Sequence, residues 1–108
     1  MREELFAAFP SLKNEELSDS YIEENPDPIW SVPDIPLIRA IPLYMLWCTK
    51  HNDDEGQLAF SGTISALNKY ARAGNQEIAW QNFKFQCSRK QTKVVLSFLI
   101  WCKDNLIL

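Results

Sequence analysis

The residues with the most chemical potential surround the only histidine, His51, which is closely followed by the carboxylates of Asp53, Asp54 and Glu55. Histidine titrates nearest neutral pH, so His51 is the one candidate for a general base at that pH. A histidine crowded by acids would also suit a hydrolytic or metal site. However, the stretch HNDDEG lacks the alternating ligand positions of a calcium loop and ends in Gly56, a residue typical of turns. We therefore interpret it as a solvated turn.

Three cysteines, Cys48, Cys87 and Cys102, could in principle join His51 in a Cys₃His zinc site. Structural zinc sites usually draw a close pair of ligands from a tight turn, whereas Cys48 and Cys102 lie within apolar segments where a thiol acts as a small hydrophobe. The sequence also lacks a phosphate-binding glycine loop and a Gly-x-Ser-x-Gly motif. We expect no metal, no cofactor and no enzymatic activity.

Charge divides the chain into an acidic and a basic half. Residues 1–55 hold twelve acidic and four basic residues, a net charge of −8, whereas residues 56–108 hold two acidic and seven basic residues, a net charge of +5. Without a catalytic motif, the acidic half favours a protein that binds a basic partner, because carboxylates steer a positively charged protein toward them.

The stretch SYIEENPDPIWSVPDIP combines acids, prolines and one tryptophan. Prolines restrict their neighbours to extended conformations, so the segment is stiff and loses little entropy when a partner binds it. Its tryptophan is either the anchor of that contact or a side chain that pins the loop to the core. The predicted partner-binding residues are the acids of this stretch and of the turn, with the tryptophan: Glu23, Glu24, Asp27, Trp30, Asp34, Asp53, Asp54 and Glu55.

The basic half supports an alternative function. Lys84, Arg89, Lys90 and Lys93 are clustered in the sequence, as in a small regulatory or adaptor domain that binds nucleic acid or protein. Cations in the first turn of a helix oppose its dipole, and the isoelectric point near 5.1 is low for a nucleic-acid binder. A nucleic-acid partner is therefore the less favoured interpretation.

Length and hydrophobic periodicity predict one all-α domain over residues 1–108, with an irregular proline-rich acidic connection at 25–36. The first expected helices span residues 2–9, a segment from an N-cap at Asn14 to near residue 24, and residues 36–50 with a kink or restart at Pro42. The next is capped by Ser61 or Thr63 and ends before Gly74. A short helix within 78–87, followed by a loop, and a last helix after Ser88 complete the expected set. The segment LYMLWCTK is expected to be the most buried.

The C-terminal segment SRKQTKVVLSFLIWCKDNL predicts the central helix. Ser88 and Gln91 have the spacing of a capping box, and the apolar residues that follow cover nearly the whole circumference of the helix. We expect five or six helices packed around it, with Trp101 buried in the core.

No apolar run reaches the roughly 18 residues that span a bilayer. The start of the chain, MREELFAAFP, carries glutamates where a signal peptide has a basic region followed by a longer apolar one. With unpaired thiols in addition, these features favour a cytoplasmic protein without a membrane partner.

A small, acidic, cysteine-containing helical domain without catalytic residues resembles the immunity proteins with which bacteria neutralise their own toxins, including those of contact-dependent growth inhibition systems. The C-terminal pattern, with Trp80 and Phe83 before SRKQ and VVLSFLIW, also resembles the ending of an uncharacterised helical bacterial family. The resemblance to immunity proteins implies tight one-to-one binding that occludes the active site of a toxin, often a basic nuclease.

Overall fold

The computed structural model describes residues 1–14, 16–28, 35–54, 56–71 and 83–106. The regular elements of these ranges are all helical, which confirms the all-α fold. They are α1 (Arg2–Ala8), the 3₁₀ helix η1 (Pro10–Lys13), α2 (Asp19–Glu24), α4 (Leu37–Lys50), α5 (Leu58–Ala71), α6 (Phe83–Gln86) and α7 (Arg89–Asn105).

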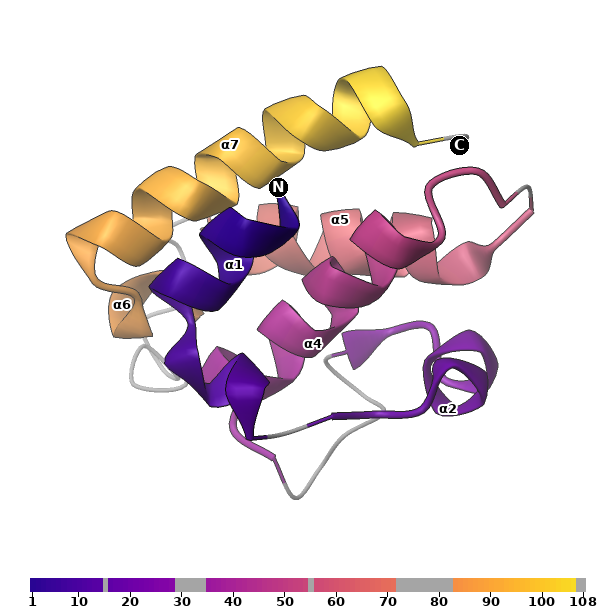
Figure 1. Ribbon diagram of the computed structural model, residues 1–108, viewed down its shortest axis with the longest axis horizontal. Helices are drawn as coiled ribbons and strands as arrows, with labels where there is room; N and C mark the ends of the chain where they lie inside the picture. The colour runs from indigo at the N-terminus through magenta and orange to yellow at the C-terminus, as the bar shows by residue number, and fades with distance from the viewer. Residues whose placement is uncertain (15, 29–34, 55, 72–82, 107–108) are drawn as a thin grey trace.

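Helix α4 is the centre of the fold. Every residue from Ala40 to Thr49 is buried, which confirms LYMLWCTK as the most buried segment up to its last residue, Lys50. The helix contacts α1, η1, α2, α5 and α6, and Figure 1 shows it crossing the middle of the molecule. It continues through Pro42, so of the expected kink or restart the restart is wrong. A proline removes one backbone donor, and the surrounding core holds the helix on both sides of it.

The helix before the acidic stretch begins later than the sequence suggests. Asn14 does not cap it; instead, Pro10–Lys13 forms η1, and Ser18 caps α2 by accepting a hydrogen bond from the Tyr21 backbone N–H at 3.1 Å. A serine hydroxyl is well placed for this bond, which satisfies a donor that the first turn leaves free. Helix α2 ends at Glu24, as expected.

Helix α5 begins before both of its expected caps. Ser61 and Thr63 lie inside the helix, and the buried Thr63 hydroxyl donates to the Ala59 carbonyl at 2.7 Å. Gly62, between them, faces the backbone of Pro26, which passes too close for any side chain. The preceding turn contains Gly56 with φ +71°, the left-handed conformation expected of it.

Helix α7 begins with the expected capping box: the Ser88 hydroxyl accepts from the Gln91 N–H at 3.1 Å, and the Gln91 side chain accepts from the Ser88 N–H at 2.8 Å. Gln91 also donates to the Ala8 carbonyl, which ties α7 to α1. Helix α7 is not central, however. Figure 1 shows it along the outer edge, and within it only Phe98 and Cys102 are buried.

The expectation that Trp101 is buried is therefore wrong. Trp101 is half-buried and stacks on Phe98, with 6.1 Å between ring centroids. Helix α7 packs only one of its apolar sides on the domain and leaves the other outward, because α4 already occupies the centre.

The short helix expected within 78–87 is present as α6 where the structure describes the chain. The predictions for residues 78–82 and for Gly74 lie outside the described residues. Within the described ranges, no helix combines the length and the apolarity needed to cross a bilayer.

Candidate functional site

Two acidic segments that are far apart in the sequence meet at one end of the molecule. One ring nitrogen of His51, Nε2, lies 3.0 Å from an Asp19 carboxylate oxygen in α2, and the other, Nδ1, lies 2.8 Å from an Asp54 carboxylate oxygen in the turn after α4. The carboxylates of these two segments, Asp19, Glu23, Glu24, Asp53 and Asp54, are here called the acidic surface.

The imidazole of His51 holds this arrangement together. Its side chain is only 20% exposed and stacks on Trp47, with 4.7 Å between ring centroids and 23° between the planes. The contact with Asp54 is a hydrogen bond, whereas the contact with Asp19 has the distance of an ion pair without the alignment of a hydrogen bond. Because a carboxylate faces each ring nitrogen, neither nitrogen is open to a substrate. His51 therefore acts as a structural clip between the two acidic segments.

Helix α2 is fixed to the core beneath the acidic surface. Ile22 is buried, and the hydroxyl of the buried Tyr44 donates to the Asn25 carbonyl at the end of α2 at 2.6 Å. The Asn25 side chain donates to the Tyr21 carbonyl at 2.9 Å, which satisfies an acceptor of the last turn. Tyr44 holds the last turn of this short helix and the Asp19–His51 contact holds its first turn, so the backbone that carries the carboxylates is fixed before any partner arrives.

A hollow of about 310 Å³ lies beside the acidic surface, where η1, α2 and α4 meet. Its lining includes the carboxylates of Glu16 and Asp19 as well as apolar side chains such as Leu17 and Leu46. This combination suits a long cationic side chain, whose aliphatic stem packs on apolar atoms while its charged end pairs with a carboxylate.

The hollow is not uniformly negative. Lys13 and Lys50 also line it, so its two positive charges balance the two negative charges of Glu16 and Asp19. The buried Trp47 contributes to the wall, and its Nε1 donor has no hydrogen-bond acceptor in the part of the chain that is described. The hollow is therefore lined by two acidic and two basic residues together with apolar side chains, and the Trp47 Nε1 atom is buried in its wall.

Most of the partner-binding residues expected from the sequence can be placed. Glu23, Glu24 and Asp53 are exposed, Asp54 is about half exposed, and Asp27 is half-buried just after α2.

The remaining three, Trp30, Asp34 and Glu55, lie outside the described residues. Asp19 was missed by the sequence reasoning, although its position four residues before Glu23 places the two on one face of α2.

The thiols are placed as core residues. Cys48 and Cys102 are buried, and burial raises the pKa of each to about 12; for Cys48 a hydrogen bond with Thr63 partly offsets the effect. Cys87 is half-buried, and burial raises its pKa to about 11. Among the residues described, no three His, Cys, Asp or Glu side chains are arranged to hold a metal ion.

The chain was compared with protein families, curated proteins and solved structures, and none of the three comparisons gave a match. No family model matches the chain, and neither a curated protein nor a solved structure resembles it at a significant level.

Proposed function

We propose that this protein is an immunity protein that binds a basic toxin of the nuclease class and occludes the toxin's active site with its acidic surface. The observation that carries the proposal is the junction at His51, which joins the carboxylates of α2 to those of the turn after α4. Two sequence segments thereby present one acidic surface rather than two separate ones.

The physical basis is electrostatic imitation of a nucleic acid. A nuclease binds the phosphate backbone through lysine and arginine side chains, so its active site attracts any surface that carries ordered anions. Glu23 and Glu24 are exposed on α2, and Tyr44 fixes the end of this helix. The two carboxylates can therefore steer such a partner while the helix that carries them loses little conformational freedom on binding.

The hollow beside the acidic surface supplies an anchor point. A lysine or arginine of the toxin would enter between Glu16 and Asp19 and pack its stem on Leu17 and Leu46. Fully desolvated anchors in pockets contribute most of the binding energy of an interface, whereas exposed charges mainly set the association rate.

The test is a stopped-flow series against the protein encoded by the neighbouring gene. Glu23→Gln with Glu24→Gln should slow association and leave dissociation nearly unchanged, because the exposed carboxylates act by steering. The difference from wild type should vanish at 1 M salt, where the Debye length is about 3 Å. The matched control is Glu3→Gln with Glu4→Gln, the same change at exposed positions of α1.

A second variant tests the clip. His51→Ala should speed dissociation, because it frees the turn from α2 and disorders the acidic surface. Equal association rates for the α1 and α2 variants, or full nuclease inhibition by a protein that lacks both Glu23 and Glu24 carboxylates, would refute the proposal.

A further inference from the structure

Helix α7 exposes an apolar stripe that the domain does not cover with described residues. Leu96 is 57% exposed and Ile100 is 66% exposed, and their spacing of four residues places them on one face of the helix. The opposite face carries the buried Phe98 and Cys102. Among the described residues, the core therefore contacts one side of α7 and leaves the other exposed.

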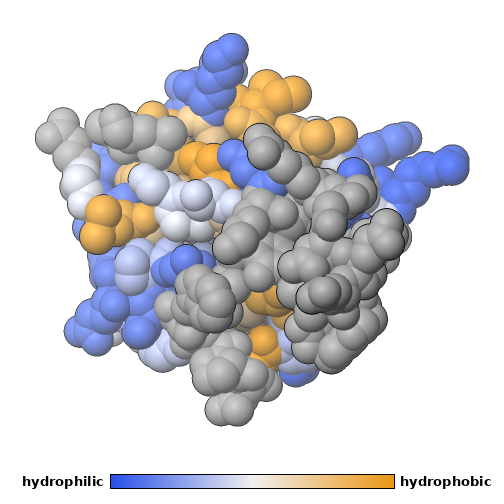
Figure 2. Space-filling view, turned by 180° about the vertical axis from the view of Figure 1, so that it is seen from behind, coloured by the Kyte–Doolittle hydropathy of each residue, from blue (hydrophilic) through white to orange (hydrophobic). Residues whose placement is uncertain are grey.

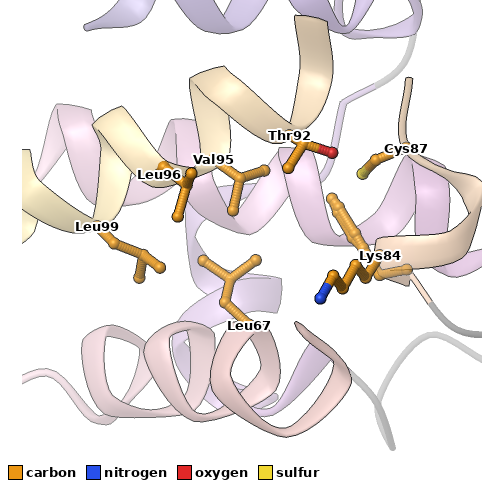
Figure 3. Close-up of a pocket in the computed structure, with 8 residues that line it drawn as sticks. Leu67, Lys84, Cys87, Thr92, Val95, Leu96 and Leu99 are labelled. Carbon is orange, nitrogen blue, oxygen red and sulfur yellow. The ribbon is translucent and has the colours of Figure 1, made fainter. Parts of the chain in front are cut away.

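A groove of about 300 Å³ runs beside this stripe between α5, α6 and α7. Figure 3 shows Leu67 pointing up from α5 toward Val95 and Leu99 of α7, with Leu96 next to them. Phe83 of α6 lines the same space. The groove and the stripe share Leu96, so together they form one continuous apolar surface, here called the α7 groove.

Basic residues lie along α6 and α7 beside the α7 groove. Residues 83–103 contain five basic residues and no acidic one; the nearest acid along the helix is Asp104. Helical spacing places Arg89 and Lys103, about two turns before and after Leu96, on the same face of α7. Lys84 lines the groove itself. Figure 2 shows hydrophobic side chains along the upper edge, where α7 lies, with hydrophilic side chains projecting beside them.

We propose that the α7 groove binds one amphipathic helix of a partner protein, with an apolar stripe at its centre and carboxylates at its ends. Apolar grooves between helices take helices whose anchors recur every three or four residues. The distance from Arg89 to Lys103 along α7 is about 21 Å at 1.5 Å per residue, so the partner helix needs about 14 residues. This surface is independent of the acidic surface, because the two attract partners of opposite charge.

The charges favour this occupant over a second copy of the chain. Two copies packed antiparallel through α7 would place Arg89 of one beside Lys103 of the other, and like charges at an interface are unfavourable. They also favour a protein over a nucleic acid. The centre of the surface, at Leu96 and Ile100, offers no donor to a phosphate, whereas a nucleic acid needs its contacts along the whole backbone.

The test uses three synthetic 16-residue peptides and fluorescence anisotropy. The first carries leucines at helical spacing with glutamates at both ends, the second has lysines in place of the glutamates, and the third is a scrambled version of the first. The first should bind wild-type protein, more weakly as salt is raised. Leu96→Ser with Ile100→Ser should weaken binding at least tenfold, and so should Lys93→Glu, which removes a cation three residues before Leu96.

Two matched controls separate the surface from general effects. Leu58→Ser removes an apolar side chain that is 71% exposed at the first residue of α5, and Lys90→Glu makes the same charge change as Lys93→Glu at another exposed position of α7. Both should bind the acidic peptide within twofold of wild type.

Four results would overturn the proposal. Equal binding of the lysine peptide would remove the charge argument. A melting temperature lowered by several degrees in Leu96→Ser would mean that the chain itself covers the stripe. A dimer in sedimentation that Leu96→Ser dissociates would assign the surface to a second copy. Tighter binding of a labelled oligonucleotide, sensitive to Lys93→Glu and not to Leu96→Ser, would assign it to nucleic acid.

Discussion

Replacing Gly62 by alanine should destabilise the protein, although alanine is the better helix former. Gly62 lies inside α5, and a Cβ built there would collide with the Pro26 carbonyl oxygen and stand 2.9 Å from the carbonyl carbon. Ordinary contacts of a Cβ begin at about 3.4 Å, and both clashing atoms are backbone that no rotamer change can move. The segment after α2 must therefore move away from α5.

The two opposing terms can be compared. Alanine in place of glycine gains about 1 kcal/mol in a helix interior. Overpacking against a well-packed neighbour costs about 1–3 kcal/mol, and the upper end applies where the neighbour is backbone. The free energy of unfolding should fall by about 2 kcal/mol, which lowers the melting temperature by roughly 10 °C in a domain of this size.

The assay is thermal and urea unfolding followed by circular dichroism at 222 nm. Ser61→Ala is the control, since it is the neighbouring exposed position of α5 and loses only a hydroxyl; it should be neutral or slightly stabilising. Because Pro26 lies only two residues after the end of α2, Gly62→Ala should also weaken any binding through the acidic surface. A Gly62→Ala protein at least as stable as wild type would refute the close packing of α5 on Pro26.

Three further predictions concern the thiols and the position of α7. Burial raises the pKa of Cys48 to about 12 from an ordinary value of 9.0, so the folded protein holds this proton more tightly than the unfolded chain does. Stability should therefore be unaffected by this thiol below pH 9 and should fall as the pH rises from 9 toward 12, measured by urea unfolding. The fall should be shallower in Cys48→Ala than in wild type and should not vanish, because Cys102 and Cys87 also have a raised pKa in the folded protein; equal slopes would contradict the burial of the Cys48 thiol. At pH 8 the native Cys87 thiol, with its pKa of about 11, should react with iodoacetamide about 100-fold more slowly than in the unfolded chain; equal rates would contradict its burial. Phe98→Ala should cost about 3–5 kcal/mol in chemical denaturation, whereas Trp101→Ala should cost distinctly less because that ring is half-buried; the reverse order would mean that α7 packs through its other face.

The parts of the fold that could be predicted from the sequence are those that depend on interactions between residues close together in the chain. The capping box at Ser88 and Gln91 depends on two side chains three residues apart, and the positive φ of Gly56 depends on one residue in a polar break. These signals need no knowledge of what lies across the core. The start of α5 was predicted too late, at a cap on Ser61 or Thr63, because both hydroxyl residues are good helix caps. In the structure Thr63 instead bonds the Ala59 carbonyl within the helix, and Gly62 packs against Pro26 of another segment.

The prediction that α7 lies at the centre of the fold was wrong for a related reason. Apolar residues on nearly all sides are typical of a buried helix. Periodicity alone does not distinguish an apolar side that packs on the protein's own core from one that is exposed and could bind another molecule. The basic residues contained the better signal: Arg89, Lys93 and Lys103 lie on the same side as Leu96, whereas α4 has no charged residue from Ala40 to Thr49. A charged residue on each side of an apolar position marks a face that meets water or a charged partner.

The acidic surface was visible in the sequence only as two unrelated acidic segments. What joins them is one histidine that the sequence presented as a catalytic candidate. Its ring stacks on Trp47 of the central helix, so the core positions His51, and His51 in turn positions both acidic segments. The α7 groove depends instead on α5, α6 and α7. Because α5 also packs against Pro26, replacing Gly62 should disturb the acidic surface through the segment after α2, whereas replacing Leu96 should leave the acidic surface intact. The two surfaces can therefore be removed one at a time.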